Sequence, residues 1–202
     1  PKAQIDCATL YPPTRYPPPS FTCSGVPNPM LIGNEYQPGT YNGITASGNY
    51  SFAPGNYCFN GNVKFSGGNI TANNVNFRMN SGTFSTTGNS TFTCSNMTFH
   101  SAGGSGFRFN GGVNNCTETI FYMETGDVQV GGNSTNTFKA PTSGAYTNLL
   151  IYLPSGNSSP VDVVGVSGSQ IWGSIIAVSS NVKLTGNNNS DGLHTQIISD
   201  TI

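Results

Sequence analysis

Charged residues are scarce in this sequence. Its 202 residues include 7 Lys and Arg and 8 Asp and Glu, for a formal net charge of −1. Binding to nucleic acid needs clustered cations that neutralise phosphates, and binding to an anionic lipid surface needs a polybasic segment. We therefore expect no nucleic acid and no lipid surface among the partners.

Long apolar runs are also missing. A membrane-spanning helix needs about 20 consecutive, mostly apolar residues, and no stretch of the sequence approaches that length. We therefore expect no direct insertion of these residues into a membrane. The chain begins with Pro1 rather than Met, which fits either a processed product or an excised fragment.

Residues that favour helices give way to residues that favour turns. The sequence contains 26 Gly, together with many Asn, Ser and Thr, and these residues form turns and make poor helices. The 12 Phe and 9 Tyr recur along the chain, so it does not have the composition of a disordered protein. The composition predicts an all-β fold with many turns.

A short motif repeats through the glycine-rich part of the sequence. A Gly-Asn-x-Ser/Thr core occurs at residues 48–51, 68–71 and 88–91, at a constant spacing of 20 residues. It returns at 132–135, which is 44 residues further on, and at 156–159. Fixed spacings of this length are typical of repeat architectures.

Short strands are predicted between the copies of this motif. Apolar residues alternate with other residues there, which is typical of a strand that faces a core on one side and solvent on the other. Two segments, 149–153 and 175–178, are instead apolar throughout, so we expect them to be covered on both faces or to border another subunit. Cations lie between two apolar residues in four of the alternating strands, and we expect them to point outward: Lys64, Arg78, Arg108 and Lys183.

The motif and the strands together predict a parallel β-solenoid over residues 31–202. Each coil of about 20 residues would stack on the previous one, because a single coil cannot bury its inner face. Roughly eight coils at about 4.8 Å each would make a rod about 40 Å long. A β-sandwich is the alternative, but it does not predict a four-residue core at a fixed spacing.

Residues 1–30 differ in composition from the rest. They hold 8 of the 13 prolines, including Pro12-Pro13 and Pro17-Pro18-Pro19. Such a segment is extended and cannot enter a central strand, because proline lacks the amide hydrogen. We expect an extended Pro-rich arm before the solenoid domain.

Five cysteines lie at positions 7, 23, 58, 94 and 116, and none forms a Cys-x-x-Cys pair. We therefore expect no zinc site, no cofactor and an oxidising, extracellular setting. Cys94 and Cys116 are 22 residues apart, close to one coil, so we pair them. We also pair Cys7 with Cys23 and leave Cys58 as a free or intermolecular thiol. In the alternative, Cys58 bonds to the arm, and Cys7 or Cys23 bonds across subunits.

Eight asparagines satisfy the N-glycosylation sequon Asn-x-Ser/Thr. The same residues suit turns and the corners of a solenoid, where asparagines stack well. If glycans are attached, the spacing of 20 residues would align them in a row along the rod. The candidates are Asn49, Asn69, Asn89, Asn96, Asn115, Asn133, Asn157 and Asn188.

Catalytic chemistry has little support in the sequence. Carbohydrate-active β-helices need clustered carboxylates, and the only local group here is Glu118, Glu124 and Asp127, which also fits a solvated turn. His100 and His194 have no Ser or Cys partner in a recognisable setting, so we expect surface or turn positions for both. The chain is not expected to be an enzyme.

Four phrases of the sequence resemble one bacterial family. They are residues 38–43 (PGTYNG), 54–58 (PGNYC), 140–152 (APTSGAYTNLLIY) and 196–202 (QIISDTI). In this order, over about residues 37–202, they look like the Gly/Asn/Ser-rich C-terminal region of TadG-like proteins, which are associated with tight-adherence (Flp) pili. The resemblance implies a bacterial envelope or surface protein without enzymatic activity. The N-terminal membrane helix of that family is absent here.

These features favour a structural subunit of an extracellular filament or pilus-associated assembly on a bacterial surface. The sequence ends in an apolar strand, so Ile197, Ile198 and Ile202 are candidate contacts with the next copy, and the arm could reach over a neighbour. Head-to-tail contacts of this kind do not close, and they produce filaments of identical copies.

Two other function classes remain open. If the arm folds back on its own rod, the chain would be a monomeric surface adhesin that binds surface glycans. Such an adhesin would present a row of exposed aromatic residues, to which Tyr50, Tyr57 and Tyr122 could contribute. A carbohydrate-active enzyme is the third class.

Overall fold

The computed structural model of the chain describes residues 16–23, 25, 31–166, 168–186 and 193–201. These residues contain no helix, and their strands form a 16-stranded sheet that winds into a solenoid. All neighbouring strands pair in parallel, except for an antiparallel hairpin at the N-terminal end. The predicted all-β parallel solenoid is confirmed.

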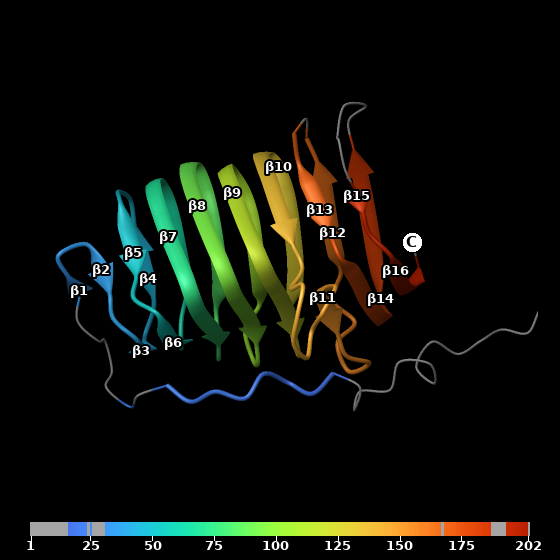
Figure 1. Ribbon diagram of the computed structural model, residues 1–202, viewed down its shortest axis with the longest axis horizontal. Helices are drawn as coiled ribbons and strands as arrows, with labels where there is room; N and C mark the ends of the chain where they lie inside the picture. The colour runs from blue at the N-terminus through green and yellow to red at the C-terminus, as the bar shows by residue number, and fades with distance from the viewer. Residues whose placement is uncertain (1–15, 24, 26–30, 167, 187–192, 202) are drawn as a thin grey trace, which may run out of the picture.

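The strands follow one another along the rod in chain order (Figure 1). They are β1 (Leu31–Ile32), β2 (Glu35–Tyr36), β3 (Gly39–Tyr41), β4 (Ile44–Ala46), β5 (Tyr50–Phe52), β6 (Gly55–Phe59), β7 (Val63–Met79), β8 (Thr83–Ser101), β9 (Gly106–Met123), β10 (Asp127–Lys139), β11 (Leu149–Leu153), β12 (Val161–Gly165), β13 (Gln170–Trp172), β14 (Ser174–Gly186), β15 (Leu193–His194) and β16 (Ile197–Thr201).

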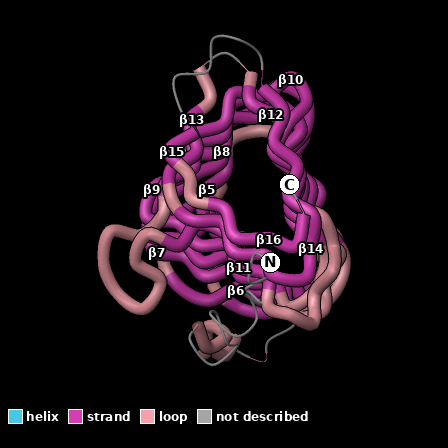
Figure 2. The backbone as a smooth tube through the Cα atoms, turned by 90° about the vertical axis from the view of Figure 1, so that its right-hand side faces the viewer, coloured by secondary structure: helices cyan, strands magenta, loops and turns pink. Residues whose placement is uncertain are grey.

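Each turn of the solenoid has three sides, and these stack into three faces around a common axis (Figure 2). The charged face consists of β4, the first parts of β7 to β10, β12 and the second part of β14. The hydroxyl face consists of β2, β5, the middle of β7 to β9, the end of β10, β13 and β15. The arm face consists of β3, β6, the last parts of β7 to β9, β11, the first part of β14 and β16.

The turns are longer than the motif spacing predicted. There are about seven turns, about 22 residues apart. Asn69 donates its amide hydrogen to Asn49 Oδ1 at 2.9 Å, so the first two copies of the motif do stack. Asn89, however, lies opposite Gly67, because a register shift displaces the third copy by two residues.

The later copies of the motif divide into two cases. Residues 91, 113 and 135 share one column, so the copy at 132–135 lies two turns above the copy at 88–91, as the spacing of 44 predicted. The copy at 156–159 precedes β12 and lies at a different corner of the solenoid. Its identical sequence therefore reflects turn chemistry rather than the same structural position.

The inward side chains change in kind along the rod. Tyr41 and Tyr57 fill the first turns, and both hydroxyls donate to backbone carbonyl oxygens. Phenylalanine fills the middle turns, where Phe99 and Phe121 stack across neighbouring strands with ring centroids 4.6 Å apart. The last turns bury mainly Val and Ile, such as Ile175. Each buried Phe or Ile contributes about 1.5–3 kcal/mol relative to an exposed one.

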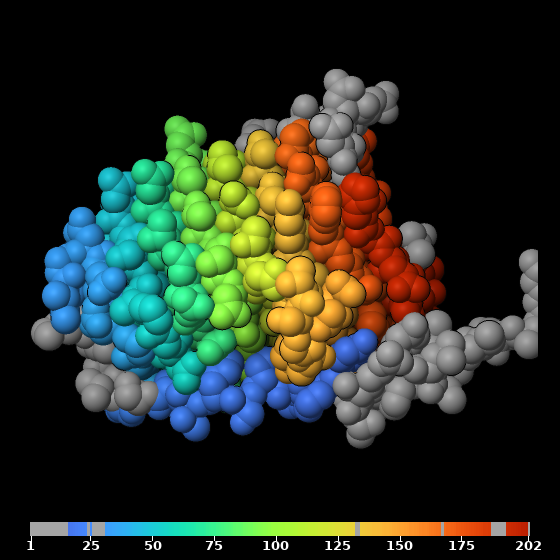
Figure 3. Space-filling view, viewed as in Figure 1, coloured from blue at the N-terminus to red at the C-terminus, as the bar shows by residue number. Residues whose placement is uncertain are grey.

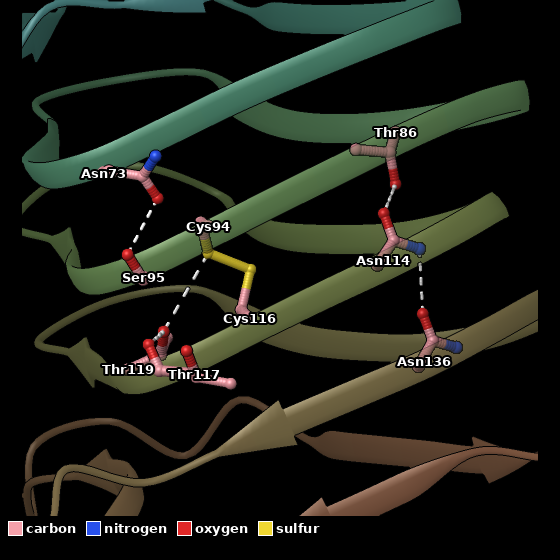
Figure 4. Close-up of a disulfide and its surroundings, with 9 residues drawn as sticks. All are labelled: Asn73, Thr86, Cys94, Ser95, Asn114, Cys116, Thr117, Thr119 and Asn136. Carbon is pink, nitrogen blue, oxygen red and sulfur yellow. Dashed lines mark hydrogen bonds between the residues drawn. A yellow bond between two sulfur atoms is a disulfide. The ribbon is translucent and has the colours of Figure 1, made fainter.

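Polar residues also form a ladder inside the rod (Figure 4). The Thr86 hydroxyl lies 3.0 Å from Asn114 Oδ1, and Asn114 Nδ2 donates to Asn136 Oδ1 at 2.8 Å. All three side chains are fully buried. Each amide accepts from one turn and donates to the next, so no turn leaves a buried amide oxygen without a donor.

The disulfide between Cys94 and Cys116 lies in the same interior (Figure 4). The two residues are partners in adjacent turns of the hydroxyl face, with Cα atoms 4.4 Å apart. The pairing predicted from their separation of one turn is confirmed.

Candidate functional site

The charged face carries outward cations and carboxylates. Lys64 and Lys183 point to solvent between buried apolar residues, as the alternation predicted. Arg108 is half-buried, and its Nη2 atom lies 3.2 Å from Asp127 Oδ2. An exposed pair of this kind contributes about 0–1 kcal/mol, so this face is a solvated surface rather than a source of stability.

The hydroxyl face carries no charge over most of its length. One outward column runs across five neighbouring turns through Ser51, Thr71, Thr93, Asn115 and Thr137. Hydroxyl and amide groups both donate and accept hydrogen bonds. The column therefore offers the same chemistry at a regular spacing of about 4.8 Å along the rod.

The arm face carries an outward apolar stripe in its last turns. Ile120, Tyr122, Leu149, Tyr152 and Ile176 form a second hydrophobic cluster, separate from the core inside the rod. All five are nearly completely buried. This explains the fully apolar segment 149–153, which is covered on both faces as one of the two expectations had it.

Residues 16–23 of the arm cover part of this face. They run along the rod, from the C-terminal turns back towards the N-terminal ones (Figures 1 and 3). Tyr122 and Tyr146 donate their hydroxyls to the carbonyl oxygens of Tyr16 and Pro17 at 2.9 and 2.6 Å, and Asn56 Nδ2 donates to Thr22 O at 3.0 Å. The rod's side chains thus satisfy carbonyls of a proline-rich segment that cannot join the sheet.

A disulfide fixes the N-terminal part of the rod to the arm. Cys23 bonds to Cys58 on β6, with Cα atoms 5.9 Å apart. The preferred pairing of Cys7 with Cys23 is therefore wrong, and Cys58 is not a free thiol. The alternative that joined Cys58 to the arm holds for this bond, because folding of the arm along the rod brings two cysteines 35 residues apart together. Cys7 lies outside the described residues.

His100 lies beneath the arm and not at the surface, so the expectation of a surface or turn position is wrong for it. Its side chain is 2% exposed, its ring contacts Phe21 at 6.1 Å between centroids, and Nε2 lies 2.8 Å from Glu124 Oε1. Burial lowers the pKa of His100, while the hydrogen bond to Glu124 opposes this shift and the charge of Arg78 adds to it. Nδ1 has no hydrogen-bond partner.

The three neighbouring carboxylates do not form a catalytic group. Glu118 accepts hydrogen bonds from the amide and hydroxyl of Thr142 at 2.7 and 3.0 Å. Glu124 pairs with His100, and Asp127 pairs with Arg108. The residues that the structure describes include no group of three or more His, Cys, Asp or Glu side chains placed to hold a metal ion.

Within the described ranges, no helix is long and apolar enough to span a membrane. The two disulfides indicate an oxidising compartment, and thus a non-cytoplasmic protein.

The C-terminal end of the rod leaves an apolar column uncovered. The inward column of the hydroxyl face passes through Cys116, Phe138 and Ile171, each at most 2% exposed, and ends at Leu193, which is 46% exposed. Among the described strands, β15 and β16 each pair on one side only. This end therefore presents apolar side chains and unpaired backbone groups together.

The predicted polymer contacts lie at this same end. Ile197 points towards the core and is half-buried, while Ile198 packs against the outward apolar stripe of the arm face. Ile202 lies outside the described residues. Leu193, which the sequence analysis did not single out, is the more exposed apolar residue of the final turn.

At the N-terminal end, the hairpin β1–β2 lies beyond the first turns and exposes Leu31 and Ile32. Behind it, Tyr36 stacks on Phe52 with ring centroids 5.0 Å apart. Both ends of the rod thus expose apolar side chains.

The sequons differ in accessibility. Asn157 is buried, donates Nδ2 to the carbonyls of Met123 and Gly126 at 3.0 Å, and accepts from the Ser159 amide, so its proposed glycosylation is wrong for the folded protein. Asn188 and the side chain of Asn133 are outside what the structure describes. The exposed candidates are Asn49, Asn69, Asn89, Asn96 and Asn115.

The expected row of exposed aromatic residues is not present. Tyr57 is in the core and Tyr122 lies beneath the arm, while only Tyr50 is partly exposed. Both buried residues occupy positions that alternation alone left ambiguous, because the arm covers outward residues as fully as the core covers inward ones.

A pocket of about 560 Å³ lies where the hydroxyl face meets the arm face, beside the loop 140–148. The sequence analysis did not predict it, because its walls come from four separate turns. Trp172 and His194 are neighbours in the register of β13 and β15, with ring centroids 4.7 Å apart, and Lys139 Nζ lies 4.6 Å from the centroid of Trp172.

No protein-family model, curated protein or solved structure matches the chain. Its class is therefore defined by its own geometry, as a disulfide-linked parallel β-solenoid with an arm along one face.

Proposed function

We propose that the chain is a structural rod of an extracellular surface assembly, and that its copies associate end to end. The observation that carries the proposal is the uncovered column at the C-terminal end, where Leu193 is exposed although every residue below it in the column is buried. A further turn from another copy would bury this side chain and pair the open edges of β15 and β16.

Other features support an extracellular, bacterial setting. Two disulfides form between residues that the fold brings together, and secreted proteins are where such bonds persist. The resemblance of residues 37–202 to the C-terminal region of TadG-like proteins favours a pilus-associated bacterial surface. In this proposal the described part of the arm acts within one molecule, since it packs along its own rod rather than across a neighbour.

The test compares two substitutions at equally exposed apolar residues. Leu193→Lys places a charge in the open column, and Val113→Lys places the same charge on the hydroxyl face, where Val113 is also 46% exposed. We expect concentration-dependent association of the unsubstituted protein in light scattering and fibres by electron microscopy. Leu193→Lys should abolish both, and Val113→Lys should leave both unchanged.

A protein that remains monomeric and forms no fibres at any concentration would remove the end-to-end proposal. Equal effects of the two substitutions would show that association uses the hydroxyl face or overall charge instead.

A surface adhesin that binds glycans is the second candidate. The uncharged column of the hydroxyl face favours it, because hydroxyl and amide side chains match the donors and acceptors of sugars. Binding of the monomeric protein to immobilised glycans, with no dependence on Leu193, would support this candidate over the first.

A further inference from the structure

The pocket between the hydroxyl face and the arm face has the dimensions of a small-molecule site. Its volume of about 560 Å³ falls in the range of about 300–1,000 Å³ that such sites occupy. Residues from β9, β10, β13 and the last turn line it, so the stacking of turns preforms it. The side chains that matter below are Glu118, Lys139, Thr142, Trp172, His194 and Gln196.

Trp172 gives the pocket an apolar wall. It is the only tryptophan of the chain and is 42% exposed, although it follows Ile171, which is buried in the core. Gly173 comes next with φ +130°, and a Cβ atom there would lie 2.5 Å from Ala140 Cβ. Glycine thus lets the loop 140–148 approach closely beside the indole, and the exposed indole forms a flat surface.

Lys139 gives the pocket a positive charge. The ion pairs among the described residues are His100–Glu124 and Arg108–Asp127, and neither includes Lys139. The carboxylate of Glu118, on the opposite wall, already accepts two hydrogen bonds from Thr142. The charge still to be matched in the pocket is therefore the ammonium of Lys139, which favours an anionic ligand.

The rim of the pocket supplies groups that both donate and accept hydrogen bonds. The amides of Gln196 and Asn148 and the hydroxyl of Thr142 line it. A flat apolar surface, one cation and several amides together match a pyranose ring that bears a carboxylate. Its C–H face would lie on the indole, its carboxylate would meet the ammonium, and its hydroxyls would meet the rim.

We propose that this pocket binds an acidic sugar, that is, a hexuronate residue of a surface polysaccharide. The inference rests on the glycan-binding candidate above and does not require end-to-end association. If the pocket fails to bind, the Leu193 experiment is unaffected.

The experiment uses the full chain at a concentration where it is monomeric, with trigalacturonate as the probe. Because Trp172 is the only tryptophan, tryptophan fluorescence reports on this pocket alone, and calorimetry measures the same titration independently. We expect a saturable change in both. Lys139→Gln should weaken binding about 10-fold or more, the effect expected for loss of a charge-assisted hydrogen bond.

Two controls separate charge recognition from loss of folding. Lys64→Gln removes an exposed lysine from the charged face, far from the pocket, and should leave binding unchanged. The methyl ester of trigalacturonate keeps the shape of the sugar and removes its charge, so it should bind the unsubstituted protein about as weakly as the acid binds Lys139→Gln.

Three results would overturn the proposal. They are no fluorescence or calorimetric change at millimolar trigalacturonate, equal binding of the acid and its methyl ester, and equal affinities of Lys139→Gln and the unsubstituted protein.

Discussion

The disulfide between Cys23 and Cys58 should decide whether the arm stays on the rod. Without it, docking rests on three hydrogen bonds, from Tyr122, Tyr146 and Asn56, at about 1 kcal/mol each, and on the burial of two aromatic side chains of the arm at about 2 kcal/mol each. These total about 7 kcal/mol. Ordering residues 16–23 costs about 1 kcal/mol per residue, or about 8 kcal/mol in all.

The two sums nearly cancel, so the covalent bond sets the balance. It closes a loop with a sequence separation of 35 residues, which corresponds to about 4 kcal/mol in the chain-entropy treatment. In the double variant Cys23→Ala/Cys58→Ala, we expect the arm to detach from a rod that stays folded, with a loss of at most about 4 kcal/mol in the free energy of unfolding.

Limited chymotrypsin digestion with intact-mass detection measures this detachment directly. Release of the N-terminal segment at Phe21 should become fast in the double variant, while circular dichroism still shows β-structure. The matched control is Cys94→Ala/Cys116→Ala, which removes the disulfide inside the rod and costs about 3 kcal/mol by the same treatment. It should leave the arm protected.

Slow cleavage of the arm in Cys23→Ala/Cys58→Ala would refute the reasoning, because the noncovalent contacts would then suffice. Loss of β-structure together with the arm would refute it in the other direction, since the arm would be an integral part of the core.

Three further predictions concern the core and the buried histidine. Phe99→Ala should lower the free energy of unfolding by about 3–5 kcal/mol in guanidinium titrations, because it opens a cavity among stacked rings; a loss below about 1 kcal/mol would mean that the neighbouring turns collapse into it. Asn114→Ala leaves Asn136 Nδ2 and the Thr86 hydroxyl each short of a partner and should cost about 1–3 kcal/mol; an unchanged stability would indicate that water enters the ladder. His100 has a lowered folded-state pKa, so the unfolded chain binds the proton more readily. This contribution is complete above about pH 6.5 and is lost as the pH falls through the folded-state pKa. Unfolding titrations between about pH 7.5 and 5 should therefore show a smaller loss for His100→Gln than for the unsubstituted protein, and parallel curves would contradict the assignment.

Much of the fold could be predicted from local patterns. Alternation around Lys64 identified strands with one buried face, and the abundance of glycine and asparagine identified the turns. The separation of Cys94 and Cys116 gave a correct disulfide, because residues one turn apart in a solenoid are neighbours in space. The length of a turn was less well predicted, since the Gly-Asn motif also forms turns at other corners, as at Asn157.

The sequence by itself determined the class of this protein. An inner face that no single turn can bury, repeated with a nearly constant period, leaves stacking of turns as the way to form a core. Only the tertiary structure decided where the arm lies, that Cys23 bonds to Cys58, and that Trp172, Lys139 and His194 share one pocket. These contacts join residues from different turns and from the arm, and their spacing in the sequence follows no period. A local pattern therefore carries no signal for them.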